Sequence, residues 1–445
     1  MGLRIVVSDA GYYPSLVDRL VSEGHTVHLT MPNLPPGATL GYLPGDGTYM
    51  TDEQVVLAAV ANSIDLYVGF ELGDTLGTTL RMFDLPVLMH DESAFRLETN
   101  RALGAAFIQH RVSGVRVAKA QTFDSLPEVK KFLAGSKSKL VVKPAPNSVG
   151  QADNDLRCHF STPPHRNTLA LVAEDGGYFD EDGQGSVRIE EFLPGVETCV
   201  GCMFDGTKFD TVFYICHEHK DAQNDSRSGV LTGEVGSTLT WHHRVQNPVV
   251  DALLDEVAQS LKGTGAGFID LNLMLDPKRK TVTLIEWTVR WGRPTMELVL
   301  ATYMGDFGAY LHRAAAGKIG TVVADYAKAA LGIVVYPYGY PLVPGNEKPQ
   351  QYPPCFKKTK GAALYPLTCV RLTPTTYIAQ DRYAVAVAVA DTIPNTEEQV
   401  LMLQARATAL AARMDIPGNT WRDDIGSHWL DDLETARICL GLNRG

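Results

Sequence analysis

The N-terminal part of the chain alternates short apolar runs with an amphipathic segment. Leu3–Val7 and Thr26–Leu29 are apolar, and Pro14–Glu23 between them has the spacing of an amphipathic helix. A strand, a helix and a strand at this distance form a βαβ unit, whose strands lie parallel in one sheet. Further apolar runs at Ile64–Val68 and Pro86–Met89 continue the alternation. The sequence therefore predicts an open parallel α/β domain at the N-terminus.

The remainder of the chain is richer in strands. Apolar runs predict strands at Leu140–Lys143, Val187–Phe192, Thr198–Phe204, Phe268–Leu275, Thr281–Glu286 and Tyr383–Ala390, and helical periodicity predicts helices at Pro248–Leu261 and Glu397–Met414. The polar stretch Asp221–Gly236 predicts a loop. We expect an α/β domain at residues 1–92, a central domain at 93–330 with a mobile subdomain at about 115–195, and an α+β cap at 331–445.

Charge and hydropathy disfavour several classes of protein. The 445 residues carry a net charge of −11 and contain no block of five Lys or Arg, so the clustered cations of a nucleic-acid surface are missing. No apolar window of about 18 residues predicts a membrane span. The first residues lack the zones of a signal peptide, which predicts a cytoplasmic protein. These features favour an enzyme that acts on small molecules.

The seven cysteines are odd in number and scattered, which disfavours a disulfide framework. Cys199 and Cys202 have the spacing of a metal or redox pair, but they lie within a predicted strand and no second pair is near. We expect reduced cysteines in a strand, with a metal or redox pair as the alternative.

Three groups of polar residues carry the chemistry. The first is Lys143, which ends an apolar strand and precedes the loop Pro144–Gly150, a loop able to wrap phosphates with backbone N–H groups. The second is Glu190, Glu191 and Glu197, about 47 residues later. Carboxylates at strand ends can bind an amino group or a pair of ribose hydroxyls. Taken singly, a surface lysine explains the first group better, and exposed glutamates at a hairpin explain the second group at least as well.

The third group lies on a predicted pair of neighbouring strands. Asp270 and Asn272 stand on the first strand, and Glu286 and Thr288 on the second, each pair at the period of two that places side chains on one face. Oxygen side chains of this kind are ligands that Mg²⁺ shares with nucleotide phosphates. Both strands are otherwise strongly apolar, which argues against a solvated polar face.

The order of a lysine strand, a Glu-Glu hinge and an acid-bearing strand pair is typical of the ATP-grasp fold. Within that fold the chain resembles the phosphoribosylamine–glycine ligases (glycinamide ribonucleotide synthetases) over nearly its whole length. The matching segments are Asp65–Glu71 (family D-L-x-x-x-G-P-E), Ile189–Glu197 (I-E-E-F-L-x-G-x-E), Glu218–Lys220 (D-H-K), Thr232–Gly236 (T-G-G-M-G), Glu286–Pro294 (E-F-N-x-R-F-G-D-P) and Arg422–Gly426 (K-D-I-G).

The resemblance implies a role for each of the matching residues. For ATP these are Lys143, Ser148 and Gly150 at the phosphates, Glu190 at the adenine amino group, the backbone of Glu191, Phe192 and Leu193 at the ring edge, and Glu197 at the ribose. For Mg²⁺ or Mn²⁺ they are Glu286, Asn272 and Thr288, with Thr288 in place of the family's Asn. Lys143, Arg290 and Lys220 are implied as catalytic, and Glu71, His219, Lys220, Thr232, Gly233, Arg290, Gly292 and Arg293 as substrate-binding.

The implied reaction is activation of a carboxylate as an acyl phosphate, followed by attack of an amine. Glycine or another small amino acid would supply the carboxylate. The first loop, Ser8–Pro14, lacks the Gly pair and the Arg of the family's G-x-G-G-R-E-H, and Arg293 replaces an Asp. These departures favour a different amine, such as a modified nucleotide or nucleobase, over genuine phosphoribosylamine–glycine ligation in purine biosynthesis. Thr288 motivates a third alternative, a nucleotide-binding pseudo-enzyme. We expect a monomer or a homodimer.

Two further expectations concern burial and metal binding. A carboxylate at Glu286 beside Leu284 and Trp287 predicts an uncompensated buried charge, so its removal should leave the unliganded protein as stable or slightly more stable. His217 and His219 bracket Glu218. We interpret these as polar residues near the substrate, with a metal trio as the alternative.

Overall fold

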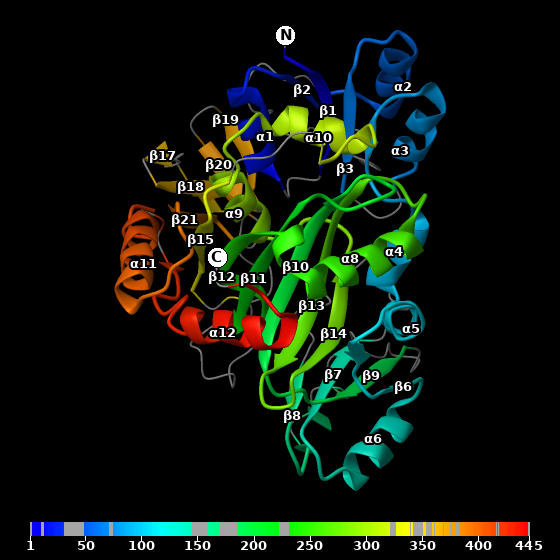
Figure 1. Ribbon diagram of the computed structural model, residues 1–445, viewed down its shortest axis with the longest axis vertical. Helices are drawn as coiled ribbons and strands as arrows, with labels where there is room; N and C mark the ends of the chain where they lie inside the picture. The colour runs from blue at the N-terminus through cyan, green and yellow to red at the C-terminus, as the bar shows by residue number, and fades with distance from the viewer. Residues whose placement is uncertain are drawn as a thin grey trace.

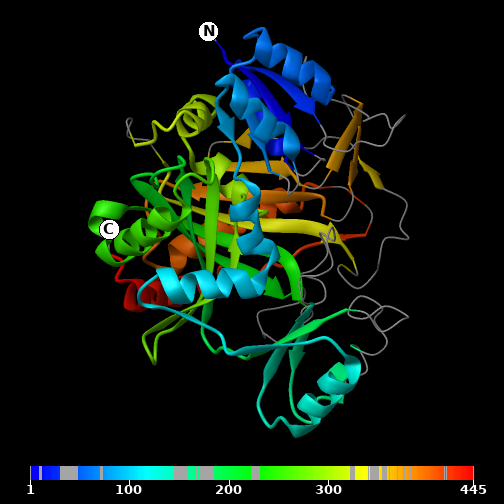
Figure 2. The same cartoon turned by 90° about the vertical axis from the view of Figure 1, so that its right-hand side faces the viewer.

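The structure is a computed structural model, and it describes residues 2–9, 13–30, 49–70, 74–144, 159–166, 168–169, 172, 185–221, 231–320, 326–338, 340, 350–352, 358–359, 361–367, 369–373, 376–379, 382–414, 416 and 418–443. A large central sheet lies between two smaller ones (Figures 1 and 2). The N-terminal sheet is at one end of the molecule, and a four-stranded sheet carrying α6 is at the other.

The N-terminal sheet is parallel, with the strand order β2-β1-β3-β4. Its elements are β1 (Arg4–Ser8), α1 (Pro14–Ser22), β2 (Thr26–Thr30), α2 (Asp52–Val60), β3 (Leu66–Gly69), α3 (Thr75–Leu80) and β4 (Val87–Leu88). Ile5 and Val7 of β1 pack in one buried cluster with Leu16 and Leu20 of α1. The predicted open parallel α/β architecture is confirmed.

The sheet at the other end has the order β6-β9-β7-β8. It consists of β6 (Ala120–Phe123), β7 (Leu140–Pro144), β8 (His159–Ser161) and β9 (Val187–Glu191), with α6 (Leu126–Gly135) packed against it. Val129 and Leu133 of α6 share a small buried cluster with Val142 and Ile189 of the sheet. This unit therefore has a core of its own.

The central sheet has the order β17-β18-β21-β15-β12-β11-β10-β13-β14-β5, with β22 paired to β15. Its strands are β5 (Val115–Val117), β10 (Val196–Phe204), β11 (Val212–Asp221), β12 (Leu231–His243), β13 (Gly267–Asp276), β14 (Thr281–Thr288), β15 (Ala329–Pro337), β17 (Lys358–Thr359), β18 (Ala362–Pro366), β21 (Ala384–Ala390) and β22 (Asn419–Thr420). A small separate sheet contains β16 (Gln350–Tyr352), β19 (Cys369–Thr373) and β20 (Thr376–Ala379).

The remaining helices are α4 (Glu92–Thr99), α5 (Arg101–Arg111), α8 (Pro248–Leu261), α9 (Thr295–Thr302), α10 (Phe307–Ala315), α11 (Glu397–Ala411) and α12 (Trp429–Leu440). In the part of the chain that the structure describes, no helix combines the length and the apolar character needed to cross a membrane.

Alternation along the central strands builds two cores, one on each face of the sheet. Val200 and Ile215 belong to the buried cluster that contains residues of α8 and α12. Their neighbours Cys199 and Tyr214 belong to the cluster that contains residues of α9 and α10. The polar residues at the strand ends continue these same alternating rows, so each row places its polar residues on a defined face.

The structure corrects the predicted loop at Asp221–Gly236. Residues 231–236 are part of β12, which pairs with β11 on one side and with β15 on the other. Residues 222–230 lie outside the described residues. Polar composition alone suggested a loop, but Leu231 pairs with Asp221 of β11, and Gly236 pairs with His219 of β11 and Ile333 of β15. Strand pairing at both ends of the segment thus holds it extended.

The C-terminal strands continue the central sheet. β15 pairs with β12 and with β21, and β21 pairs with β18. The predicted boundary at residue 330 falls inside β15. The α+β composition expected for this part of the chain is observed, and the three domain boundaries stay predictions.

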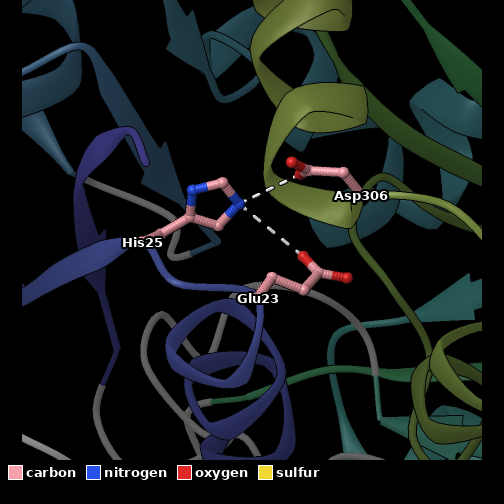
Figure 3. A group of neighbouring side chains, drawn as sticks. All are labelled: Glu23, His25 and Asp306. Atoms are coloured by element: carbon pink, nitrogen blue, oxygen red, sulfur yellow. Dashed lines mark hydrogen bonds and ion pairs between the residues drawn. The ribbon is translucent and has the colours of Figure 1, made fainter. Parts of the chain in front are cut away.

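A trio of polar side chains joins the N-terminal region to α10 (Figure 3). The Nε2 atom of His25 lies 3.0 Å from Oδ1 of Asp306 and 3.7 Å from Oε2 of Glu23. These residues have the spacing of metal ligands. However, Nδ1 of His25 accepts from the N–H of Leu3, and Glu23 Oε2 accepts from the N–H groups of Phe307 and Gly308. The trio is therefore a hydrogen-bonded contact between the turn that joins α1 to β2 and the start of α10.

Candidate active site

A cavity lies where the β6–β9 sheet faces the end of the central sheet. The cavity has a volume of about 180 Å³. Residues from both sheets line it, and the predicted ones among them are Lys143, Glu190, Glu191, Phe192, Leu193, Glu197, His219, Lys220, Thr232 and Glu286. Side chains separated by up to 143 positions in the chain thus converge on one cavity.

Lys143 and Glu190 form a buried ion pair in this cavity. The pairing of β7 with β9 sets Lys143 opposite Arg188, two residues before Glu190. The Nζ atom of Lys143 lies 2.9 Å from Glu190 Oε2, and Nε of Arg188 lies 2.6 Å from Oε1. Burial alone would raise the pKa of the Glu190 carboxyl, but the two cations outweigh it and lower the pKa. Each carboxylate oxygen of Glu190 is therefore already paired with a cationic side chain.

The hinge between β9 and β10 presents its backbone to the cavity. The N–H of Glu191 donates to the carbonyl of Lys119 at 2.9 Å, and the N–H of Phe192 donates to the carbonyl of Lys139 at 3.3 Å. Two of the three hinge N–H groups are thus engaged within the protein. Leu193, which also lines the cavity, carries the third.

Gly195 fixes the approach of this hinge to the central sheet. It has a φ of 144°, and a Cβ placed there would lie 2.2 Å from the carbonyl oxygen of Leu275. This conformation favours glycine, and any side chain at this position would clash with that oxygen.

Lys220 lies at the centre of a cluster of carboxylates at the ends of β10, β11 and β14. Its Nζ atom lies 2.7 Å from Glu197, 3.1 Å from Glu218 and 3.3 Å from Glu286. Arg101 of α5 approaches Glu286 to 3.8 Å from the other side. Lys220 and Arg101 thus compensate a half-buried group of three carboxylates.

The carboxyl groups of this cluster are held in different protonation states. Burial would raise the pKa of Glu286, but Lys220, Arg101 and Lys143 lower it to about 2. Burial raises the pKa of Glu218 to about 7, against the opposing effect of Lys220. Glu286 therefore stays ionised at neutral pH, whereas Glu218 is close to its titration point. The expectation of an uncompensated charge at Glu286 was wrong, because Lys220 and Arg101 come from elements that the local sequence does not reveal.

The predicted metal ligands meet at the junction of β13 and β14. Asn272 pairs with Glu286 in the strand register, and its Nδ2 atom lies 3.4 Å from Glu286 Oε1 and 3.4 Å from Thr288 Oγ1. Its Oδ1 atom is buried and has no hydrogen-bond partner among the described residues. Asn272, Glu286 and Thr288 thus bring oxygen atoms together, and a bound cation would give Asn272 Oδ1 the partner that it lacks. This donor set fits Mg²⁺ or Mn²⁺.

A second group of polar residues surrounds the loop from β14 to α9. Arg290 pairs with Glu98 at 3.0 Å, and the guanidinium of Arg293 lies 5.9 Å from the centre of the Tyr13 ring. Gly292 lies beside Asp270, since a Cβ placed on it would be 3.5 Å from Oδ2 of that residue. These contacts bring the loop after β1 next to the loop after β14.

Arg382 adds a further cation to this second group. Its Nη1 donates to the carbonyls of Glu234 and Arg293, and a Cβ placed on Gly233 would lie 3.9 Å from the same atom. Thr232 Oγ1 donates to the carbonyl of Lys220 at 2.7 Å, which connects this group to the Lys220 cluster.

Some predicted site residues lie elsewhere or outside the described residues. Glu71, Ser148 and Gly150 lie outside the described residues. His217 and His219 line the cavity, but with Glu218 they do not bring three ligand atoms within 4.8 Å of one another; among the described residues only the trio at His25 does so. The alternative of a metal trio at residues 217–219 is therefore not supported.

The cysteines of the central strands are buried thiols. Cys199, Cys202 and Cys216 are free, and burial raises the pKa of each well above its usual value. The predicted reduced cysteines in a strand are observed for Cys199 and Cys202.

The sequence did not identify six residues of this region as candidates for the site: Glu98, Arg101, Arg188, Glu218, Glu234 and Arg382. Glu218 and Glu234 stand inside the quoted motif segments, so the motifs themselves were a usable signal. Glu98 lies in α4 and Arg382 lies just before β21, and no local sequence pattern marks either as a site residue.

The chain is similar to known ligases in sequence and in fold. Residues 105–296 match the family model described as phosphoribosylglycinamide synthetase, ATP-grasp (A) domain. A phosphoribosylamine–glycine ligase of Ralstonia nicotianae is 26% identical over 263 residues, which cover 57% of this chain and 59% of that protein. The match thus spans about three fifths of the length of this curated relative.

Solved structures share the fold over a greater length. The phosphoribosylamine–glycine ligase of Thermotoga maritima has a TM-score of 0.66 at 17% identity, covering 95% of this chain and 100% of that one. The biotin carboxylase domain of the Hydrogenobacter thermophilus 2-oxoglutarate carboxylase, in complex with MgADP, ADP and bicarbonate, has a TM-score of 0.64 at 10% identity, covering 99% of each chain. The protein has the ATP-grasp fold, and it resembles the phosphoribosylamine–glycine ligases.

Burial of Glu297 predicts a pH dependence of stability. Burial raises the pKa of its carboxyl to about 7. Between pH 5 and 8 this carboxyl group is therefore protonated in a larger fraction of folded molecules than of unfolded chains. The contribution of Glu297 to the free energy of unfolding must then fall as pH rises through this window. As the pH rises from 5 to 8, we expect the free energy of unfolding of Glu297→Gln to increase by roughly 1–3 kcal/mol relative to that of the wild type.

Urea unfolding at several pH values measures this difference. Glu53 is exposed on α2, and Glu53→Gln serves as a control whose stability difference should not change with pH. A Glu297→Gln difference that is constant across the window would contradict the prediction.

Proposed function

We propose that the protein is an ATP-dependent carboxylate–amine ligase that forms an amide through an acyl phosphate. The observation that carries this proposal is one cavity lined by the buried Lys143, by Lys220 and by Glu286. Glu286 lies beside Asn272, which in turn lies beside Thr288. A cation for phosphates and a divalent-ion site on its other side are the components that phosphoryl transfer needs.

ATP would lie between the hinge and the strand ends of β13 and β14. The adenine ring would meet the N–H of Leu193, because the N–H groups of Glu191 and Phe192 are already engaged. Glu197 would bind the ribose and Lys143 the phosphates. Glu190 holds Lys143 and Arg188, so we assign it the positioning of these cations in addition to the predicted contact with the adenine amino group.

A divalent ion held by Glu286, Asn272 and Thr288 would neutralise phosphate charge during transfer. Lys143 and Lys220 would bind the transferring phosphoryl group, which passes from ATP to a carboxylate oxygen and leaves ADP. Arg290 would orient the resulting acyl phosphate. The amine nitrogen then attacks the carbonyl carbon, the C–N bond forms and the C–O bond to phosphate breaks. The phosphate leaves with the electron pair, and the amine proton passes to it or to water.

The substrates belong to the same proposal. The similarity to phosphoribosylamine–glycine ligases supports glycine or another small amino acid as the carboxylate and an amine as the acceptor. Genuine phosphoribosylamine–glycine ligation is the second candidate and is favoured by the motif match. A cytoplasmic location, and a monomer or a homodimer, stay predictions.

Release of ADP tests the proposal. The protein is incubated with MgATP, glycine or a mixture of amino acids, and a panel of amines that includes phosphoribosylamine. We expect ADP and amide in equal amounts only when both a carboxylate and an amine are present. Tight ATP binding without ADP release under every combination would instead identify a nucleotide-binding protein without catalysis.

Thr288→Asn tests the metal assignment. An amide oxygen is a better ligand for Mg²⁺ than a hydroxyl, and Thr288 lies 3.4 Å from Asn272 in the oxygen set. We expect ADP release to be held or raised and the Mg²⁺ concentration for half-maximal activity to fall by about two- to tenfold. An unchanged Mg²⁺ dependence with lower activity would place the ion elsewhere.

A further inference from the structure

Lys220 stands at an irregular point in the pairing of β11 with β12. His219 lies opposite Gly236, whereas Asp221 lies opposite Leu231, so the register shifts at Lys220. At such a shift the extra residues are left without a paired residue, and the ladder of backbone hydrogen bonds is locally disrupted. The position of Lys220 therefore depends on contacts outside the ladder.

Two side chains bind the backbone of β11 at this point. Oγ1 of Thr232 donates to the carbonyl of Lys220 at 2.7 Å. Nη1 of Arg422 donates to the carbonyl of Asp221, the next residue, at 2.9 Å. Arg422 lies 201 positions further along the chain, just before α12. The C-terminal part of the chain thus reaches the strand end that carries Lys220.

Arg422 is itself held in one orientation by Asp424. Its Nε atom lies 2.7 Å from Oδ1 of Asp424, and its Nη2 atom lies 2.6 Å from Oδ2. This bidentate pair uses one edge of the planar guanidinium group, while Nη1 donates to the β11 carbonyl. The side chain of Arg422 is only 3% exposed, and it lines the same cavity as Lys220. Asp424 therefore both orients the guanidinium group and balances its charge.

The position of Lys220 matters because one ammonium group serves three carboxylates. Its Nζ atom lies 2.7 Å from Glu197, 3.1 Å from Glu218 and 3.3 Å from Glu286. A movement of the β11 backbone would change these three distances unequally. Phosphoryl transfer depends on cations that are held where charge develops, and a misplacement of about 1 Å lowers a rate by roughly 100-fold.

We propose that Arg422 is a positioning residue for Lys220. Through the carbonyl of Asp221 it holds the end of β11, and with it the ammonium group of Lys220, in the place from which that group binds the transferring phosphoryl group. Arg422 acts through Lys220 and does not touch the reacting atoms. This proposal rests on the proposed ligase function and adds a residue of the C-terminal part of the chain to it.

A double-mutant cycle tests this role, because residues that act through one another have non-additive effects. We measure kcat for ADP release with saturating substrates, at a temperature at which thermal unfolding shows every variant to be folded. Arg422→Gln should lower kcat by about 10- to 100-fold. In a Lys220→Gln background the same substitution should lower kcat by less than about threefold. A purely structural role predicts the same factor in both backgrounds, and that result would overturn the proposal.

Two milder variants decide the question if Lys220→Gln does not fold. Arg422→Lys keeps a donor for the carbonyl but loses the planar fork, and Asp424→Asn keeps the arginine but weakens the pair that orients it. Both should lower kcat less than Arg422→Gln does. Equal kcat in Arg422→Lys and Arg422→Gln would overturn the proposal. The control Arg437→Gln removes an arginine of α12 that lies 3.4 Å from Glu434, and it should leave kcat unchanged.

Binding distinguishes this proposal from the ligase function itself. Calorimetry with a non-hydrolysable ATP analogue and Mg²⁺ gives the same cycle without catalysis, since Lys220 would contact the terminal phosphate. Non-additive losses of affinity, without ADP release from the wild type under any combination of substrates, would refute the ligase function and retain the assignment of Arg422. ADP release with additive effects in both measurements would do the reverse.

Discussion

Glu286→Gln is expected to lower kcat for ADP release by at least about 100-fold. The substitution removes the only carboxylate among the three proposed metal ligands and leaves Asn272 and Thr288, which are neutral. It also removes the carboxylate 3.8 Å from Arg101 and one of the three carboxylates around Lys220, which lies 3.3 Å from Glu286. We therefore expect the unliganded variant to be less stable than the wild type, since a buried pair loses one partner.

Steady-state kinetics over a range of Mg²⁺ concentrations and thermal unfolding without ligands measure both effects. Glu53→Gln, at an exposed site, is the matched control. Near-normal turnover in Glu286→Gln would remove the metal assignment, and the β13–β14 pair would then be purely structural. A variant more stable than the wild type would show that the cations do not compensate Glu286.

Lys143→Met should weaken ATP binding by roughly 10- to 150-fold, because charge-assisted hydrogen bonds contribute about 1.5–3 kcal/mol each. It should also slow the chemical step, since phosphoryl transfer depends on cations placed at the transferring group. The fold should persist, because Arg188 still pairs with Glu190 at 2.6 Å.

Titration calorimetry with MgATP and single-turnover ADP formation separate these two effects. Lys130 is exposed on α6 of the same subdomain, so Lys130→Met controls for the loss of one positive charge. Equal ATP affinity in Lys143→Met and Lys130→Met would contradict the assignment of Lys143 to the phosphates.

The sequence predicts the elements whose pattern is local. β13 and β14 follow from their apolar runs, and the period of two places Glu286 and Thr288 on one side of the strand. The helix at residues 248–261 follows from its periodicity and is observed with the same bounds. The lysine strand and the Glu-Glu hinge are also local patterns, and this is why Lys143, Glu190 and Glu191, which line one cavity, could be named together from the sequence.

The elements that tertiary pairing decides could not be predicted in this way. The composition of residues 231–236 predicts a polar loop, but pairing of Leu231 with β11 and of Gly236 with β11 and β15 makes them part of a strand. Arg382 reaches Glu234 from a position 148 residues away in the chain. The charge balance at Glu286 depends on Lys220 and Arg101, which lie on β11 and α5. A local sequence pattern predicts on which face of a strand a side chain lies. The residue that it contacts depends on the assembled fold.

The fate of a carboxylate oxygen tests the central claim most directly. Amino acid labelled with ¹⁸O in its carboxylate is incubated with MgATP and an amine that supports ADP release. If the carboxylate attacks the γ-phosphorus and the amine then displaces phosphate, one ¹⁸O atom must leave in inorganic phosphate for each amide formed. Mass spectrometry of the phosphate should show this transfer. Unlabelled phosphate, or label in AMP, would contradict an acyl-phosphate ligase.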